Sequence, residues 1–286
     1  MKKPIGIIGG SGLYAAEGLE PRQEHRLSTP FGNPADAYLE TEHAGRSVFF
    51  LPRHARGHRL LPSEINHPAN IFGFKKLGVE CVVAFTAVGS LREEIAPRDI
   101  LLPDQYIDRT KRNHTFFGNG LVAHVPFGDP VCPVLHRQLA EAAQRVALQA
   151  TDGPKIHTGG TYVNIEGPTF STRAESNLYR AWGCDVVGMT SLPEAKLCRE
   201  AQLPYAAIAL VTDYDCWHES EEAVSAALVA ENVKANLDFA RSLLLELIPR
   251  LEGPWSKAVT GALQGAVMTA PDQIPATLRS KLAPLL

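Results

Sequence analysis

The amino-acid sequence predicts an α/β fold, in which a single domain is built on a central mixed, mostly parallel β-sheet flanked by helices. Three observations favour this class. Short apolar or β-branched runs, typical of buried strands, recur along the chain. Amphipathic helical patterns lie between some of these runs, as in proteins whose strands and helices alternate. The composition is that of an ordinary globular protein, because 45% of the 286 residues are hydrophobic and 21% are charged.

Six runs have the composition of strands, and two segments have helical periodicity. We expect strands at residues 5–8, 47–51, 79–85, 161–165, 185–189 and 205–212. One helix begins at Pro133 and carries an apolar face, and a longer helix runs from about residue 221 to 248, where Pro249 ends it. Prolines and a Gly-Pro pair in 251–286 predict a tail of short helices and turns. The tail belongs to the one domain, which spans 1–286 and has its core at about 4–250.

Charge, hydropathy and cysteine content exclude several classes of protein. The chain has 28 Lys and Arg against 31 Asp and Glu, whereas nucleic-acid-binding domains usually carry a basic excess. No apolar run reaches the roughly 18 residues that a membrane span needs. The 5 cysteines are scattered and form no Cys-x-x-Cys pair, so we expect a reduced, cytoplasmic protein. The Lys2-Lys3 start resembles a signal peptide only faintly, because a glycine run at 9–12 interrupts the apolar stretch.

Small or polar residues follow every predicted strand, and open sheets place ligand sites at the carboxyl ends of their strands. The glycine run at 9–12 follows the first strand, and its backbone N–H groups together with the Ser11 hydroxyl suit one phosphate group. A tight turn alone would also need these glycines. Residues 10–15 match the dinucleotide pattern G-x-G-x-x-A, which leaves a nicotinamide-dependent dehydrogenase as an alternative. Prolines at 21, 30 and 34 disfavour it, because the long helix that this pattern requires does not fit.

A basic cluster follows the second strand. Residues 53–59 hold three arginines and two histidines, and arginine favours phosphate or carboxylate, which it binds through paired hydrogen bonds. His54 and His58 stand four residues apart, as metal ligands on a helix would, but the neighbouring arginines would repel a cation. The cluster therefore predicts an anion site, with a solvated basic loop as the alternative.

Small residues follow the third strand at 86–90. They let a ligand approach the backbone, and the Thr86 hydroxyl can donate a hydrogen bond to it. Ser90 and Glu93 also have the spacing of a capping box at the start of a helix. Both interpretations can hold together.

Asp213 and Asp215 follow the sixth strand and are the candidates for acid–base chemistry. On an extended segment the two carboxylates face the same side. Two carboxylates in one low-dielectric site do not both ionise easily, so one stays protonated and can act as an acid. A divalent metal site and an ordinary turn at the strand end are the alternatives. Cys216 is expected to be a buried structural cysteine rather than a nucleophile.

Eight ordered motifs carry a resemblance to a known family. They occupy residues 5–13, 53–58, 62–66, 69–71, 86–95, 165–175, 188–190 and 212–217. Together they resemble the trimeric nucleoside phosphorylases, which include purine nucleoside phosphorylase and 5′-methylthioadenosine phosphorylase. The match runs from about residue 4 to 250, and the tail beyond Pro249 matches weakly. The resemblance implies the nucleoside phosphorylase fold and a reaction in which inorganic phosphate attacks C1′ of the ribosyl group while the purine leaves.

The resemblance also implies roles for individual positions. The phosphate site would comprise Ser11, Arg53, His54, Thr86, the backbone of Ala87, and Thr190. The nucleoside side would comprise Phe170, Ser171, Met189, Ala226 and Val229, with His124 supplied by a neighbouring subunit. Ala226 stands where the methylthioadenosine branch tends to carry a larger aliphatic residue, so the 5′ pocket is expected to be apolar but roomier.

Hydrogen-bond polarity at the purine favours adenine. The resemblance places Asp213 at N7 and Asp215 at the 6-amino group, and a protonated Asp213 can donate to N7 while Asp215 accepts from the exocyclic N–H. Members that act on 6-oxopurines carry Asn at the first of these positions. The resemblance therefore implies phosphate-dependent cleavage of 5′-methylthioadenosine to adenine and 5-methylthioribose 1-phosphate, with adenosine or 6-oxopurine nucleosides as alternatives. It also implies a homotrimer that uses phosphate as co-substrate and needs no cofactor and no metal.

Overall fold

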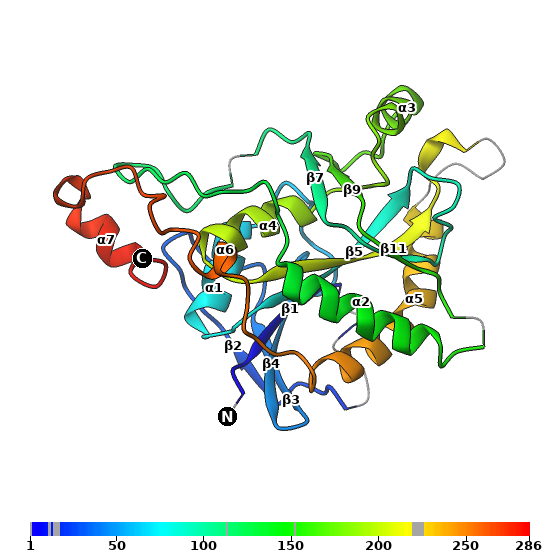
Figure 1. Cartoon of the computed structure of the whole chain (residues 1–286), viewed down its shortest axis with the longest axis horizontal. Coiled ribbons are helices and arrows are strands. Elements are labelled where there is room, and N and C mark those ends of the chain that lie inside the picture. The colour runs from blue at the N-terminus through cyan, green and yellow to red at the C-terminus, as the bar shows by residue number, and fades with distance from the viewer. Residues whose placement is uncertain (1, 11–12, 14–17, 113, 152, 219–225) are drawn as a thin grey trace.

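The structure of the chain is a computed structural model that describes residues 2–10, 13, 18–112, 114–151, 153–218 and 226–286. At the centre of its sheet, β1 (Ile5–Gly9) lies between β4 (Arg46–Pro52) and β5 (Val82–Ser90), parallel to both. On its other edge β5 pairs in parallel with β11 (Tyr205–Asp213). The predicted mixed, mostly parallel sheet is confirmed (Figure 1).

Shorter strands extend this centre in three directions. Beyond β4 lies β3 (Tyr38–His43), which is antiparallel to β4, and then β2 (Gln23–His25), which is antiparallel to β3. At the carboxyl end of β5, β10 (Val186–Gly188) pairs antiparallel and continues to β9 (Thr161–Asn164) and β7 (Gln105–Asp108). Beyond β11 lie β6 (Ile100–Leu102) and β8 (Ile156–Thr158). The sheet is therefore branched, because β1 and β10 pair with different parts of β5, whereas β11 pairs with nearly its whole length.

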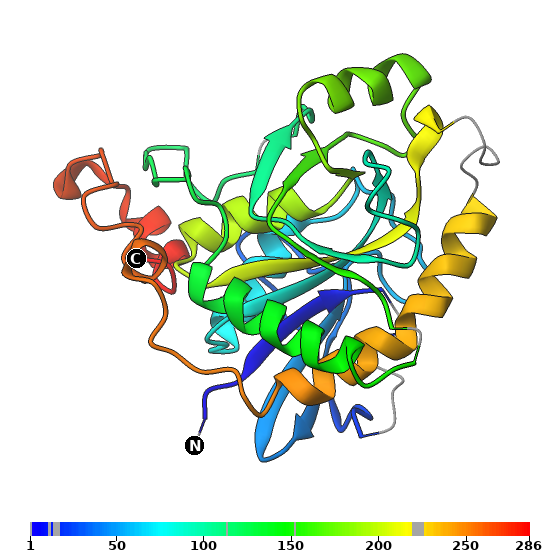
Figure 2. The same ribbon diagram turned by 45° about the vertical axis from the view of Figure 1, so that its right-hand side comes forward.

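The central strands are buried on both faces, which explains their continuous apolar sequences. Ile7 and Val83 point into a core that α2 (Pro133–Ala147) and α5 (Ala226–Leu247) cover. The alternate residues, Ile8 and Ala84, point into a second core, which α1 (His67–Lys76) and α4 (Ser191–Glu200) cover. Figures 1 and 2 show α2 and α5 crossing one face of the sheet.

The remaining helices frame the carboxyl ends of the strands. Helix α3 (Arg173–Ala181) begins at a capping box of Thr172 and Glu175 and stands apart from the two helical layers (Figure 2). It contacts the single turn η1 (Asp215–Trp217), which follows β11. The expected capping box at Ser90 is wrong. Ser90 is the last residue of β5, and its hydroxyl bonds the backbone of Arg92 within a turn.

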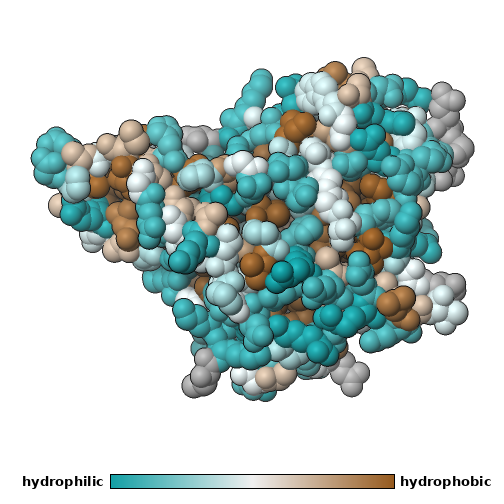
Figure 3. Space-filling view, viewed as in Figure 1, coloured by the Kyte–Doolittle hydropathy of each residue, from teal (hydrophilic) through white to brown (hydrophobic). Residues whose placement is uncertain are grey.

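The tail forms α6 (Lys257–Thr260), η2 (Pro271–Gln273) and α7 (Ala276–Leu282), as the proline pattern predicted. Leu282 and Leu285 are buried in the core of α1 and α4, and Ala123 forms a β-bridge with Val267. The tail and the segment that contains Ala123 project together at one end of the molecule (Figure 1), and apolar side chains gather on this projection (Figure 3). Among the described residues, no helix has the length and apolar character to cross a membrane.

Candidate active site

The sheet opens along one edge of β5. Strand β1 pairs with residues 82–84 of β5, whereas β10 pairs only with Gly89 and Ser90. Between these contacts, the edge of Thr86–Val88 on that side has no paired strand among the described residues. Thr86 is buried and Ala87 is exposed, so the backbone of Ala87 is accessible to a ligand. The sequence placed residues 86–90 after the strand, but they continue it, and the opening arises because β1 ends at Gly9.

Arg53, directly after β4, is held at this opening by a buried acid. Its Nε and Nη2 donate to the two carboxylate oxygens of Glu194 at 2.7 and 3.1 Å, and its Nη1 donates to the Phe85 carbonyl at 2.5 Å. The side chains of Arg53 and Glu194 are 4% and 1% exposed. Two further guanidinium N–H groups are left for a ligand, since arginine has five donors in total. Arg53 is therefore an oriented donor for an anion, and Glu194 balances its charge.

Tyrosine hydroxyls surround the Arg53–Glu194 pair. Tyr205 Oη donates to Glu194 at 3.1 Å and contacts Ser191 Oγ at 2.9 Å. The Tyr162 hydroxyl is fully buried beside Thr86 and the backbone of Thr190, and none of its contacts within the described part of the chain has full hydrogen-bond geometry. Gly188 makes room for it, because an added Cβ would lie 1.9 Å from Tyr162 Oη. A buried, unpaired hydroxyl at this place is available to an anion.

Thr190 lies at the N-terminus of α4 and, like Thr86, beside the Tyr162 hydroxyl. It is the N-cap residue, yet its side chain makes no capping hydrogen bond. Asn164, fully buried, donates to the Met189 carbonyl at 3.2 Å and accepts from the Leu192 N–H at 3.3 Å, which fixes the start of the helix. The Thr190 hydroxyl therefore stands at the helix end that carries a partial positive charge, and no capping bond occupies it.

His54 is neutral at pH 7, because burial lowers its pKa to about 4. Its Nδ1 lies 2.8 Å from the Leu60 carbonyl, which can only accept, so Nδ1 carries the proton and Nε2 is an acceptor. The His58 ring stacks on His54 with centroids 4.3 Å apart. His58 has a φ of 51° and does not continue a helix from His54, so the i, i+4 metal arrangement is absent here.

Only part of the predicted basic cluster belongs to the site. Arg56 pairs with Asp36 at 2.9 Å and with Glu24, and Arg59 is exposed and bonds the Arg56 carbonyl. The charged groups of Arg56 and Arg59 thus bond other residues at the surface, so these two residues form the solvated basic loop that was the alternative interpretation. The described residues contain no group of three or more His, Cys, Asp or Glu side chains suited to a metal ion.

Asp213, the last residue of β11, lies buried against Gly89 of β5. Its Oδ1 accepts from the Asp215 N–H at 2.8 Å, and its Oδ2 lies 2.7 Å from Thr212 Oγ1. An added Cβ on Gly89 would lie 2.9 Å from Asp213 Oδ1, so only glycine allows this approach. Burial raises the pKa of Asp213 above its usual value, while hydrogen bonds accepted by its carboxylate oppose the rise.

Asp215 reaches the same place by a turn, not by strand alternation. It opens η1 with a φ of 51°, which Asp tolerates better than most residues. Burial raises the pKa of Asp215, and the Asp213 carboxyl raises it further, while the Ser176 hydroxyl opposes the rise. Asp215 Oδ2 is buried beside the hydroxyls of Ser171 and Ser176, which lie near enough to lower its pKa, although no contact of these three atoms among the described residues has full hydrogen-bond geometry. The turn that was the alternative interpretation of these two aspartates is therefore present, and it holds a cluster of polar groups that a ligand can contact.

The other predicted residues divide into three groups. Phe170 is exposed, Met189 half-buried, and Cys216 half-buried, with its thiol donating to the Ser171 carbonyl at 3.2 Å. Ser11 lies outside the described residues, and so do the side chains of Ala226 and Val229, although both positions belong to α5. The exposed His124 lies on the projecting segment, where its N–H bonds Ala266 of the tail.

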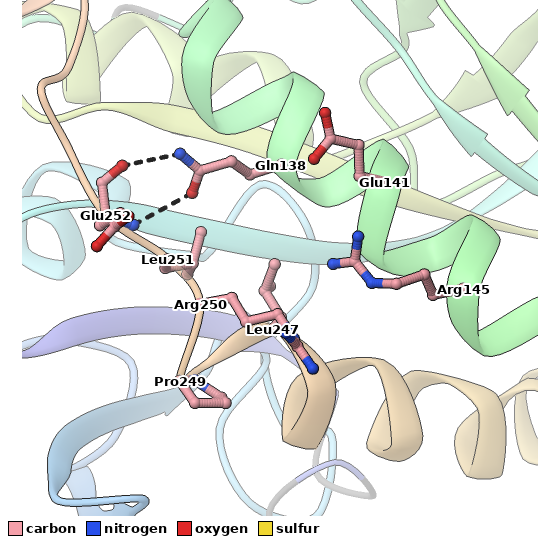
Figure 4. A pocket seen from close by; sticks show the side chains of 8 residues that line it. All are labelled: Gln138, Glu141, Arg145, Leu247, Pro249, Arg250, Leu251 and Glu252. Atoms are coloured by element: carbon pink, nitrogen blue, oxygen red, sulfur yellow. Dashed lines mark hydrogen bonds between the residues drawn. The ribbon is translucent and has the colours of Figure 1, made fainter.

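A shallow pocket elsewhere on the molecule is separate from this site (Figure 4). It lies between α2 and the residues after α5, near the amino end of β1, because Lys2 bonds the Pro249 carbonyl at its rim. Arg145 and Arg250 both pair with Glu246 at 2.8 Å. Its basic side chains are thus already paired.

Sequence reasoning missed four buried polar residues that organise the site: Tyr162, Glu194, Ser176 and Thr212. Glu194 offered no clear signal, because Lys196, Arg199 and Glu200 stand in the same segment and make it look solvent-exposed. Its partner Arg53 is 141 residues away, and no local pattern identifies such a pair.

Comparison with known proteins gives consistent matches. Residues 4–249 match the phosphorylase superfamily. An S-methyl-5′-thioadenosine phosphorylase of Thermosynechococcus vestitus is 52% identical over 289 residues, covering 100% of this chain and 99% of the relative. A crystal structure of a methylthioadenosine phosphorylase from an Antarctic soil metagenomic library superposes with a TM-score of 0.92 at 45% identity, covering 99% and 98% of the two chains. A mutant of the adenosine/methylthioadenosine phosphorylase of Schistosoma mansoni, in complex with methylthioadenosine, has a TM-score of 0.83 at 34% identity, covering 92% and 99%.

Proposed function

The chain belongs to the phosphorylase superfamily, and from this membership we infer that it cleaves the N-glycosidic bond of 5′-methylthioadenosine with inorganic phosphate. The products are adenine and 5-methylthioribose 1-phosphate. The observation that carries this function is a buried pair of acids, Asp213 and Asp215, beside an opening in the sheet that presents anion donors. It stands in a chain that is 52% identical over its full length to an S-methyl-5′-thioadenosine phosphorylase.

Phosphate would bind at the opening along β5. The donors are Arg53, the hydroxyls of Thr86 and Thr190, and the backbone of Ala87, and Ser11 completes the set from the glycine run. Tyr162, whose buried hydroxyl is unpaired among the described residues, joins them. His54 Nε2 accepts, so it suits the one remaining P–OH group of the phosphate dianion. A phosphate oxygen attacks C1′ as the N9–C1′ bond breaks, and the electron pair of that bond goes to the purine.

The purine would lie between Asp213 and Asp215. Asp213, whose protonated form burial favours by raising its pKa, gives its proton to N7 and the adenine leaves neutral. Asp215 accepts a hydrogen bond from the 6-amino group, and its Oδ2, which no described residue contacts by a hydrogen bond, supports this role. Phe170 and Ser171 border the base, and Met189 lies against the ribose. Ala226 and Val229 line the 5′ group.

We propose the remaining features on the basis of the family resemblance. The protein works as a cytoplasmic homotrimer in which His124 and the apolar projection meet a neighbouring subunit. The exposed His124 and the exposed apolar side chains of Val122 and Met268 support this assembly. Phosphate is a co-substrate, and no metal or cofactor takes part. Each subunit is one domain whose core spans about 4–250 and carries the tail 251–286.

One absorbance assay tests the proposal. Release of adenine from 5′-methylthioadenosine is followed with and without phosphate. We expect turnover only with phosphate and a higher kcat/KM than for adenosine or 5′-methylthioinosine. Equal turnover without phosphate would identify a hydrolase, and a preference for the 6-oxopurine would overturn the assignment of the two aspartates.

A further inference from the structure

The turn that carries Asp215 is bonded to the end of β5 through a tryptophan. Trp217, the last residue of η1, donates from its indole Nε1 to the Ser90 carbonyl at 2.8 Å. The residue before Ser90 is Gly89. An added Cβ there would lie 2.9 Å from Asp213 Oδ1 and 3.3 Å from Asp215 Cβ. The indole therefore fixes η1 to the part of the strand against which both aspartates pack.

Helix α3 supplies a second contact to the same indole. Arg180 Cζ lies 3.4 Å from the centroid of the Trp217 ring, so the guanidinium stacks on the ring in a cation–π contact. Helix α3 lies beside η1 (Figure 2), and its Ser176 hydroxyl is close to the Asp215 carboxyl. Trp217 thus joins three elements, β5, α3 and η1, around Asp215.

The backbone of Asp215 needs such support. Its φ is 51°, in the left-handed region, which Asp adopts at a lower cost than most residues but not without one. A residue keeps this conformation only where the surrounding structure fixes it. Tyr214 anchors the turn near the surface, where it donates to the Glu93 carbonyl at 3.2 Å. Trp217 anchors it to the fully buried Ser90.

We propose that Trp217, held by Ser90 and Arg180, is a positioning residue that keeps Asp215 at the 6-amino group and thereby sets a preference for adenine over 6-oxopurines. This inference rests on the proposed function. The Asp215 carboxylate accepts from an exocyclic N–H, whereas it repels the lone pairs of a 6-oxo group. A turn that is no longer fixed weakens the first contact and relieves the second. Both effects reduce the preference, and neither involves the phosphate.

The test measures kcat/KM for 5′-methylthioadenosine and 5′-methylthioinosine, together with the KM for phosphate. Trp217→Phe keeps a ring for Arg180 but removes the indole N–H. It should lower the ratio of the two kcat/KM values about fivefold or more, while the KM for phosphate stays within about twofold of wild type. Arg180→Gln should lower the ratio too, and Arg180→Lys, which keeps a cation for the ring, should lie closer to wild type.

Trp182→Phe is the matched control. Trp182 stands at the end of α3, is 44% exposed, and also lies under an arginine, because Arg109 Cζ is 5.5 Å from its ring centroid. We expect this variant to keep the wild-type ratio. An equal fall of both kcat/KM values in Trp217→Phe, or a parallel rise in the KM for phosphate, would show that Trp217 is only structural and would overturn the proposal.

Calorimetric binding of adenine and hypoxanthine in the presence of phosphate gives a readout without turnover. Trp217→Phe should bring the two Kd values closer together. If this variant does not fold, Arg180→Gln retains the indole N–H and decides the question, since an unchanged preference in it overturns the proposal. Phosphorolysis with an unchanged preference overturns this inference alone. A wild-type preference for adenine that Trp217→Phe reduces, in a protein without phosphorolysis, rejects the proposed function alone, and a wild type that prefers hypoxanthine overturns both.

Discussion

Replacement of Asp213 by Asn separates hydrogen bonding from proton transfer at the purine. The amide has the shape of the protonated acid. Its oxygen can accept from the Asp215 N–H, now 2.8 Å from Oδ1, and its nitrogen can donate across the 2.7 Å contact to Thr212. Thr212 then keeps its hydrogen for the Val88 carbonyl. We therefore expect Asp213→Asn to fold and to bind phosphate normally.

The variant cannot give a proton to N7. A positioned general acid contributes about 10²- to 10⁴-fold to the rate, so kcat/KM for 5′-methylthioadenosine should fall by this factor. The limb at which activity falls with rising pH should disappear. 5′-Methylthioinosine should lose less, because the amide can donate toward N7 and the 6-oxo group. The ratio of the two kcat/KM values, measured in the same buffer, should move toward the 6-oxopurine by about tenfold or more.

Stability gives a second readout with a definite sign. Burial raises the pKa of Asp213 in the folded protein, so the folded state keeps a proton that the unfolded chain releases above a pH of about 4. Stability must therefore fall as the pH rises from about 4 through the raised pKa. Asp213→Asn removes this contribution, and its Tm relative to wild type should be higher at pH 7 than at pH 4. An unchanged substrate ratio together with a parallel Tm profile would refute the acid role of Asp213.

Three further predictions concern the rest of the site. Arg53→Lys should raise the KM for phosphate at least tenfold and the KM for the nucleoside less, because one ammonium group cannot contact both Glu194 oxygens, the Phe85 carbonyl and a ligand. Arg59→Lys is the exposed control, and an equal rise in both KM values would show that Arg53 is structural. Gly89→Ala should lower kcat/KM for 5′-methylthioadenosine at least tenfold while phosphate still raises the Tm, since the new Cβ would lie 2.9 Å from Asp213 Oδ1; Gly128→Ala, whose Cβ would meet nothing within 4 Å, should behave like wild type. Dialysis against a chelator should leave the activity intact. If the activity is lost and one divalent ion restores it, the two aspartates bind a metal instead.

Sequence reasoning succeeded where the signal is local. Apolar runs indicate the buried strands, and small or polar residues follow them. The carboxyl edge of the sheet could therefore be predicted from the sequence alone. Asp213 and Arg53 were chosen as candidates in this way, and the structure buries both of them. The course of β5 was not predicted, because Thr86–Ser90 reads as a loop, although pairing with β11 keeps it extended up to Gly89.

What escaped prediction depends on partners distant in sequence. Glu194 is recognisable as part of the site only when α4 brings it to Arg53, and the Thr212 hydroxyl has a backbone partner only because β5 places the Val88 carbonyl beside it. Asp215 was expected to reach the site by strand alternation, whereas a residue with positive φ turns it there. Periodicity describes one segment at a time, and these features are relations between segments.

These distant partners determine the charge of the site rather than its location. Glu194 balances Arg53, and His54 is neutral because burial lowers its pKa to about 4. In the phosphate site that we propose, a dianion would be held chiefly by directed donors from Thr86, Thr190 and the start of α4, not by an excess of positive charge. At the purine, burial likewise favours the neutral form, because it raises the pKa of both Asp213 and Asp215. In both halves of the site the polar groups are thus buried and close to neutral before the substrates bind. In such surroundings electrostatic contacts with the substrates are strong, and they need little rearrangement when the glycosidic bond breaks.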